Sequence, residues 1–105
     1  RREGAVTVVA PAGDIVADAV PELKSRLRDL VHSGVQQLTL DLSGTYMIDS
    51  VGLGLLLSTY NSIQAMGGRF AVIHASDELM DLFRSLRVHQ HFSVSGAPEH
   101  TWSVT

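Results

Sequence analysis

Strand-type and helix-type segments alternate along this chain, and the alternation limits the folds it can adopt. Short runs of β-branched or alternating apolar residues occupy 5–10, 36–42 and 69–74, with a last short run at 91–94. Between these runs, apolar residues recur three and four positions apart, as on one face of a helix, over 19–33, 50–66 and 76–87. Parallel strands joined by helices produce this order. The sequence therefore predicts an α/β fold of successive βα units.

The size and composition of the chain suit one globular domain. Its 105 residues can bury a hydrophobic core, and 45% of them are hydrophobic and 18% charged. We find no internal repeat, low-complexity segment or linker, so the predicted domain spans residues 1–105. No apolar run approaches the roughly 20 residues that a membrane-spanning helix needs.

Charge and cysteine content exclude several classes of function. The net charge of -3 offers no basic patch for nucleic acid or for an anionic membrane, so neither is an expected partner. The chain has no cysteine, which excludes disulfides and thiolate metal sites. Absence of cysteine is consistent with a reducing compartment, and we expect a cytoplasmic protein.

Capping residues predict where the helices begin and end. Asp18 is the expected N-cap of the first helix, with Pro21 in the first turn and Gly34 just after the end. Gly67-Gly68 ends the second helix. Ser76 is the expected start of the third helix. That helix is predicted to bury Leu79, Leu82, Phe83 and Leu86.

Residues 47–57, MIDSVGLGLLL, place polar and flexible residues within the most apolar part of the chain. Tyr46, Met47 and Ile48 are expected to run under the core before Asp49-Ser50 opens a helix. Asp and Ser commonly cap helices, which is the simplest interpretation of this pair. Two glycines at 52 and 54 each cost about 1 kcal/mol in helix propensity. Close packing of the helix on the sheet is the simplest reason for them.

The same geometry permits a functional interpretation of Ser50. A hydroxyl at a helix N-terminus is exposed, and a phosphate added there would face free N–H groups and the positive end of the helix dipole. Phosphorylation would change the surface charge by about -2 without refolding the domain. From the residues alone, two interpretations of the stretch stay open: a helix cap at a tight turn, and a switchable binding surface.

Motifs for catalysis are incomplete. Gly52-Leu53-Gly54 lacks the third glycine of a dinucleotide fingerprint, because Leu57 occupies that position. The only lysine, Lys24, lies within a predicted helix and cannot belong to a phosphate-binding loop. Ser50 lacks the preceding glycine of a hydrolase nucleophile elbow. We therefore expect no catalytic residue and no cofactor.

The histidines give no complete metal site. His89 and His91 are two positions apart and would share one face of a strand. Two ligands do not close a site, so no metal is expected and exposed loop histidines are the preferred interpretation.

The segment 38–74 resembles the STAS family, which includes the anti-sigma factor antagonists. The family has a strand that ends in Asp, here Asp41, and then Asp-Ser-x-Gly-Leu-Gly at a helix start, here residues 49–54. Gly-Gly before the next strand is matched by residues 67–68. The resemblance extends to Gly13-Asp14-Ile15 and to Leu82-Phe83, and it covers roughly residues 6–94.

This resemblance implies a mixed sheet of about four strands backed by helices, and a function in protein binding and not in catalysis. It implies binding to an anti-sigma factor, often itself a serine kinase, and loss of that binding when Ser50 is phosphorylated. A PP2C-type phosphatase would restore the binding. The implied partner-binding residues are Asp14, Asp49, Ser50, Val51, Gly52, Leu53 and Gly54.

Two alternatives stay open. STAS domains also occur as interaction or ligand-sensing modules of larger assemblies and transporters, where the serine need not be phosphorylated. The chain does not begin with Met, so we expect it to be trimmed or cut from a longer protein. A nucleotide-binding or hydrolysing domain is the third hypothesis.

Overall fold

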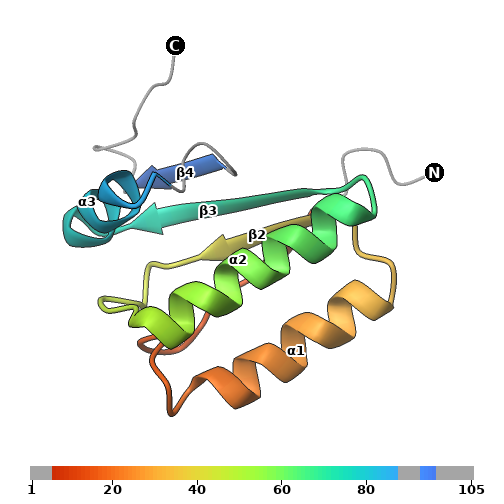
Figure 1. Ribbon diagram of the computed structural model, residues 1–105, viewed down its shortest axis with the longest axis horizontal. Helices are drawn as coiled ribbons and strands as arrows, with labels where there is room; N and C mark the ends of the chain where they lie inside the picture. Colours follow the sequence, from red (N-terminus) through yellow and green to blue (C-terminus); the bar gives the residue numbers. More distant parts are fainter. Residues whose placement is uncertain (1–5, 88–92, 97–105) are drawn as a thin grey trace.

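A computed structural model describes residues 6–87 and 93–96 and forms one sheet with three helices in these residues (Figure 1). The elements are β1 (Thr7–Val9), α1 (Val20–His32), β2 (Gln37–Asp41), α2 (Ser50–Ala65), β3 (Arg69–Ala75), α3 (Asp77–Ser85) and β4 (Ser93–Gly96). The predicted alternation of strands and helices, and with it the α/β class, is confirmed.

The four strands lie in the sheet in chain order, and every described pair is parallel. Leu40 of β2, for example, lies between Val9 of β1 and Val72 of β3. A parallel pair needs a long crossover, and each crossover here contains one helix that returns the chain to the opposite edge. The described strands therefore form a parallel sheet and not the mixed sheet that the resemblance implied.

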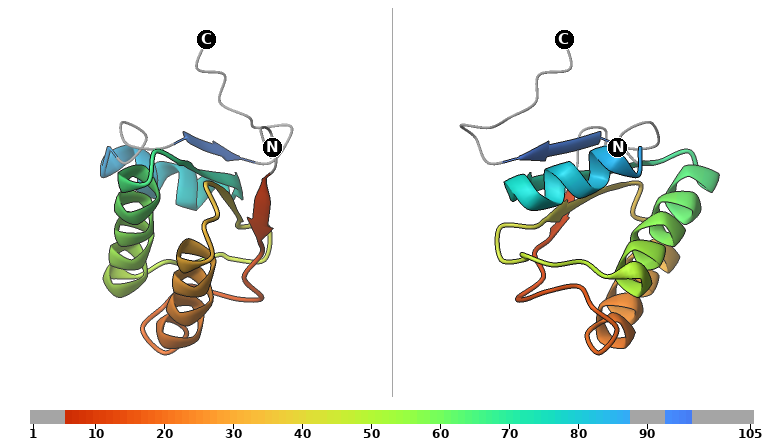
Figure 2. Two further views of the ribbon diagram at one scale, coloured as in Figure 1. Left: turned by 90° about the vertical axis from the view of Figure 1, so that its right-hand side faces the viewer. Right: turned by 60° about the vertical axis from the view of Figure 1, so that its left-hand side comes forward.

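Helices α1 and α2 lie side by side along the sheet, and α3 contacts β3 and β4 (Figures 1 and 2). The core between the sheet and the helices is mostly aliphatic and forms one continuous cluster. Its fully buried side chains include Leu27, Leu38, Leu40, Leu56, Ile63, Val72 and Phe83. Burial of this kind contributes on the order of 1.5–3 kcal/mol for each large side chain.

Several helix ends follow their predicted signals. Gly34 has a φ of 93° and follows the C-cap of α1, as expected for glycine at that position. The Ser76 hydroxyl accepts a hydrogen bond from the Leu79 N–H at 3.2 Å and caps α3. Pro21 lies in the first turn of α1. These predictions are confirmed because each signal acts within a few residues.

Two local predictions are wrong. Asp18 does not cap α1; Ala19 holds the N-cap position, because the N–H groups of Ala19 and Val20 bond to the Val16 carbonyl and form the turn. Leu86 is 47% exposed, because α3 ends before this side chain reaches the core. Residues 5, 91 and 92 of the predicted outer strands lie outside the described residues.

Gly52 and Gly54 differ in their surroundings. A Cβ on Gly52 would overlap the main-chain carbonyl oxygen of Ile15, so only glycine fits there. A Cβ on Gly54 would meet no atom within 4 Å. Close packing therefore explains Gly52, although its neighbour is the β1–α1 loop and not the sheet. The same explanation is wrong for Gly54, which lies on the exposed face of α2.

We expect Gly52→Ala to lower the free energy of unfolding by about 1–3 kcal/mol, because the added methyl group must displace the Ile15 main chain. Gly54→Ala is the matched control in the same helix. It should raise the free energy of unfolding by up to about 1 kcal/mol, since alanine is the better helix former. Denaturant unfolding followed by circular dichroism measures both, and equal effects would contradict the assigned contact.

Candidate functional site

The candidate site lies at the edge of the sheet where the parallel strands end. The loops that follow β1 and β2 run side by side there, with Ile15 and Ile48 forming a parallel bridge. The Ile15 N–H donates to the Met47 carbonyl at 3.0 Å, and the Asp49 N–H donates to the Ile15 carbonyl at 3.3 Å. These bonds extend the pairing of β1 with β2 and place the start of α2 against the β1–α1 loop.

Asp49 joins the two loops through its side chain. Its Oδ1 accepts a hydrogen bond from the Gly52 N–H at 2.8 Å, which makes it the N-cap of α2. Its Oδ2 accepts a hydrogen bond from the Ala17 N–H at 2.9 Å. These two donors, Gly52 first, hold the pKa of Asp49 below its usual value, because they favour the ionised form. We call this arrangement of Asp49, Gly52 and Ala17 the Asp49 clasp.

Asp14 joins the same two loops, but here the carboxylate belongs to the β1–α1 loop and the N–H donors belong to the loop that follows β2. Its Oδ1 accepts hydrogen bonds from the Tyr46 N–H at 2.8 Å and the Met47 N–H at 3.1 Å. Beside it, the buried Thr45 hydroxyl donates to the Gly13 carbonyl at 2.9 Å. The family resemblance implied a site role for both Asp14 and Asp49, and the structure brings them to one edge. Each carboxylate serves the fold as an acceptor of backbone hydrogen bonds.

Ser50 is the exposed first residue of α2. Among the described residues its hydroxyl makes no hydrogen bond, because the neighbouring Asp49 already caps the helix. The capping interpretation, that Asp49 or Ser50 caps the helix, is therefore confirmed, and the capping residue is Asp49. Modification of the Ser50 hydroxyl would not remove a cap.

The other predicted partner-binding residues divide by exposure. Val51 and Gly54 are exposed, Leu53 is partly buried against the core, and Gly52 is buried under the Ile15 carbonyl. Only Val51 and Gly54 of these four can therefore offer a partner much surface. Gly52 contributes indirectly, because its lack of a side chain lets the Ile15 main chain pack against α2.

Tyr46 and Met47 are also exposed, and the sequence prediction for them is wrong. Their side chains are 71% and 57% exposed, and only Ile48 of this run is buried. Asp14 binds their N–H groups, which holds the segment at the surface and not beneath the core. The turn residues Ser43-Gly44-Thr45 just before them are the one signal in the sequence that favours a surface loop.

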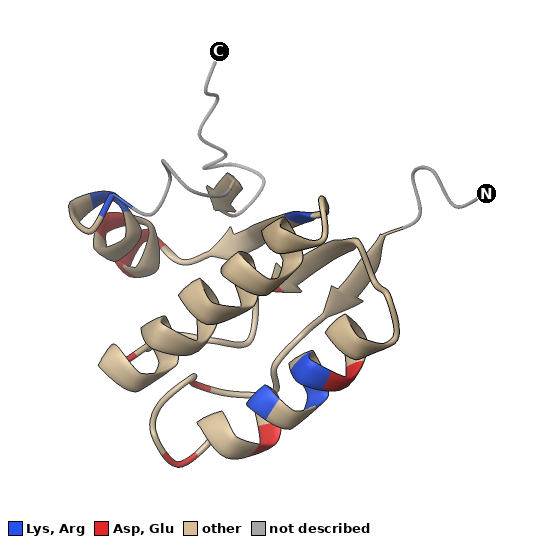
Figure 3. Ribbon diagram, turned by 45° about the vertical axis from the view of Figure 1, so that its right-hand side comes forward, with Lys and Arg blue, Asp and Glu red and all other residues tan. Residues whose placement is uncertain are grey.

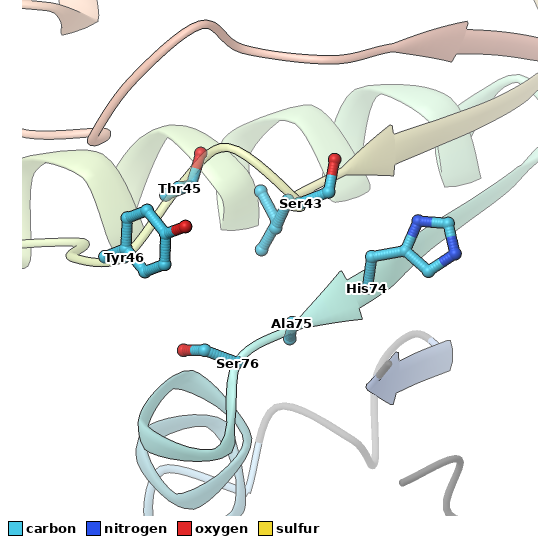
Figure 4. A pocket seen from close by; sticks show the side chains of 7 residues that line it. Ser43, Thr45, Tyr46, His74, Ala75 and Ser76 are labelled. Carbon is cyan, nitrogen blue, oxygen red and sulfur yellow. The ribbon is translucent and has the colours of Figure 1, made fainter. Parts of the chain in front are cut away.

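A cavity of about 400 Å³ opens beside Tyr46 (Figure 4). Residues at the ends of β2 and β3 line it, namely Leu42, Ser43, Thr45, Tyr46, His74, Ala75 and Ser76. His74 has a φ of 60°, and its Nδ1 lies 3.0 Å from Asp41 Oδ1. The Ser43 N–H, with a smaller contribution from His74, holds the pKa of Asp41 below its usual value.

Residues 6–87 and 93–96 contain no group of three or more His, Cys, Asp or Glu side chains that could hold a metal ion. His89 and His91, the pair considered for a metal site, lie outside the described residues. In the described part of the chain, no helix is long and apolar enough to cross a membrane.

Comparison with known families agrees with this arrangement of loops and helices. The profile of the STAS domain matches residues 1–101. The chain belongs to the STAS domain family. The resemblance seen in residues 49–54 and 67–68 is thereby confirmed.

One curated relative has a named role. The anti-sigma-B factor antagonist of Bacillus subtilis (strain 168) is 31% identical over 72 residues, which are 69% of this chain and 65% of that protein. The chain thus spans a little under two thirds of the length of this relative.

Solved structures share the fold. The protein TM1081 of Thermotoga maritima superposes with a TM-score of 0.83 at 20% identity, covering 90% of this chain and 81% of TM1081. The unphosphorylated anti-sigma factor antagonist SpoIIAA gives a TM-score of 0.69 at 20% identity, covering 94% and 86% of the two chains. Phosphorylated SpoIIAA from Bacillus gives the same TM-score and covers 94% and 88%. These likenesses confirm the STAS-type α/β fold.

We expect Asp49→Asn to lower the thermal midpoint. The amide oxygen can still accept from Gly52, but the amide NH₂ then faces the Ala17 donor. Ser50→Ala is the adjacent control and should shift the midpoint by no more than roughly 2–4 °C, because the Ser50 hydroxyl holds no bond. A shift for Ser50→Ala as large as that for Asp49→Asn would contradict the assignment of the cap.

The difference in stability between the wild type and Asp49→Asn should also depend on pH. Because folding lowers the pKa of Asp49, the carboxylate contributes stability above its unfolded value of about 3.9. That contribution is lost as the pH falls through the lower folded value. Urea unfolding of both proteins at about pH 7 and about pH 3 measures this. The difference in unfolding free energy between them should be smaller at the lower pH. A difference that does not change with pH would show that the charge of Asp49 does not stabilise the fold.

Proposed function

We propose that this protein is an anti-sigma factor antagonist that binds an anti-sigma factor through the surface around Ser50 and releases it when Ser50 is phosphorylated. The observation that carries this proposal is the exposed, unbonded Ser50 hydroxyl in the first turn of α2 of a STAS domain. The Bacillus subtilis relative supports the class of partner, since it is named an anti-sigma-B factor antagonist.

Apolar side chains around Ser50 supply a reason for a partner to bind here. Tyr46, Met47 and Val51 are all large, hydrophobic and about half exposed or more. Burial of such surface contributes about 25 cal/mol per Å² of apolar area, before the cost of association is subtracted. The hydrogen bonds of the Asp49 clasp already join the two loops in the free domain, which reduces the ordering that a partner would have to impose.

Phosphorylation would affect the complex more than the fold. In the free domain, a phosphate on Ser50 lies in solvent at the positive end of the α2 dipole. In a complex it would place a charge of about -1.5 to -2 among Tyr46, Met47 and Val51, where burial of an unpaired charge is strongly unfavourable. The same modification is therefore tolerated by the domain and opposed by the interface.

The proposal assigns catalysis to the partners. A serine kinase-like anti-sigma factor would phosphorylate Ser50, and a PP2C-type phosphatase would remove the phosphate. This chain contributes an accessible hydroxyl that its neighbour Asp49 has freed from capping. It takes part as a substrate of those enzymes and as a binding module.

The cavity beside Tyr46 favours a second candidate function. A STAS module that senses a small ligand without phosphorylation needs a preformed cavity, and about 400 Å³ falls within the range of ligand sites. A ligand there would contact Tyr46 and so act on the same surface that the first proposal uses. The two candidates differ in whether Ser50 is modified.

We expect Ser50→Asp to keep the wild-type circular dichroism spectrum and to lose affinity for the anti-sigma factor by at least about tenfold, through buried charge. Asn61→Asp adds the same charge on the exposed face of α2, away from the site, and should bind like the wild type. Ser50→Ala should bind the partner and resist phosphorylation. Calorimetric titration with the anti-sigma factor measures the affinities.

Phosphate mapping by mass spectrometry decides between the two candidates. Incubation with the candidate kinase and ATP should place phosphate on Ser50 alone. Phosphate found only on other serines, or none with a kinase shown to be active, would refute the switch. Small-molecule binding that perturbs Tyr46 while Ser50 stays unmodified would then favour the ligand-sensing module.

A further inference from the structure

A second concave surface lies between α1 and α2 and has no part in the proposed switch. It encloses about 180 Å³. One wall carries Lys24, Arg28 and His32 on successive turns of α1, and the other carries Ser58, Thr59 and Ser62 of α2. We call this surface the α1–α2 groove.

The basic side chains of the groove have no counter-charge along their own helix. No Asp or Glu lies three or four positions from Lys24 or Arg28, and these two cations are themselves four apart and repel each other. Neither forms an ion pair with any described residue. The chain nevertheless has a net charge of -3. Lys24 and Arg28 thus place two positive charges beside the α1–α2 groove of a protein whose net charge is negative.

Arg26 on the same helix differs in its sequence neighbours, although it too forms no ion pair with a described residue. Glu22 lies four positions before it and Asp29 three positions after it, so acidic residues flank Arg26 along α1. Arg26 does not line the groove. By helical spacing, the acidic residues of α1 are therefore i,i+3 and i,i+4 neighbours of the cation outside the groove and not of the two that line it. Figure 3 shows the charged positions of α1 along the ribbon.

The wall formed by α2 adds hydroxyl donors and no charge. Residues 50–65 contain no Lys, Arg, Asp or Glu, as the uncoloured ribbon of α2 shows (Figure 3). Ser58 and Ser62 lie one turn apart, and within the described residues their hydroxyls make no hydrogen bond. Thr59 is different, because its hydroxyl donates to the Leu55 carbonyl at 2.8 Å. Two serine hydroxyls thus remain to face the cations of α1.

We propose that the α1–α2 groove binds a compact oxyanion of the phosphate class. Lys24 and Arg28 supply charge and charge-assisted donors, and Ser58 and Ser62 donate from the opposite wall. The small volume suits phosphate or pyrophosphate, either free or carried by a small phosphate ester. Ser58 follows Ser50 by about 12 Å along α2, so this site is separate from the proposed phosphorylation site.

Titration of the ¹⁵N-labelled full chain, followed by NMR at constant ionic strength, tests the site. The probes are sodium phosphate, sodium pyrophosphate and glycerol 3-phosphate. We expect saturable shifts confined to residues 24–32 and 55–62, with pyrophosphate the tighter of the two inorganic probes because it can reach both cations. Saturation by glycerol 3-phosphate but by neither inorganic probe would assign the site to an ester. Shifts that do not saturate, or that saturate elsewhere, would overturn the proposal.

Charge-matched variants separate a built site from general attraction. Lys24→Gln and Arg28→Gln should each weaken binding of the saturating probe by at least about tenfold, the usual effect of losing a charged hydrogen bond. Arg26→Gln removes the same charge from the same helix and should leave the affinity within about twofold. Ser62→Ala tests the opposite wall and should also weaken binding. Equal losses for Arg26→Gln and Arg28→Gln would overturn the proposal, and circular dichroism checks that every variant is folded.

Discussion

One carboxylate, that of Asp49, determines how the first two βα units meet. Its two oxygens accept N–H groups from residues 35 positions apart in the chain, Ala17 in the β1–α1 loop and Gly52 in α2. The missing side chain of Gly52 lets the Ile15 carbonyl come close enough to accept the Asp49 N–H. The close approach of Ile15 and the bond from Asp49 to it therefore both depend on the absence of a side chain at position 52.

In the proposed switch, the clasp also separates two tasks that one residue could not perform together. A capping side chain holds a hydrogen bond to the helix, and a reactive hydroxyl at that position would have to give it up. With Asp49 as the cap, the next residue is left exposed and unbonded. Asp14 makes a similar contribution from the other loop, because its bonds to the Tyr46 and Met47 N–H groups hold two apolar side chains in solvent. The loops around Ser50 are thus held in place by two acidic residues, Asp14 and Asp49, whose carboxylates accept backbone hydrogen bonds.

The parts of this structure that could be predicted are those whose causes lie close together in the chain. Helical spacing indicated α1, α2 and α3, and local caps such as Ser76 marked their ends. Tyr46 and Met47 were misjudged because their position depends on Asp14, more than thirty residues earlier. Gly52 and Gly54 look equivalent in the sequence and differ only because Ile15 packs against one of them. The Asp-Ser pair was predicted to be a site, and its capping residue is Asp49, whose second oxygen also accepts from Ala17 of the other loop.

The distance between the two proposed anion positions on α2 determines how strongly they repel each other. A phosphate on Ser50 and an anion at Ser58 would be about 12 Å apart along the helix axis. That separation exceeds the screening length of about 8 Å at physiological salt, so direct repulsion between them is weak. No ionisable side chain of α2 lies between the two positions, so none can couple them electrostatically. Phosphorylation and groove binding should therefore be nearly independent at physiological salt. Mutual weakening should appear only when the salt concentration is lowered to the point where the screening length reaches about 30 Å.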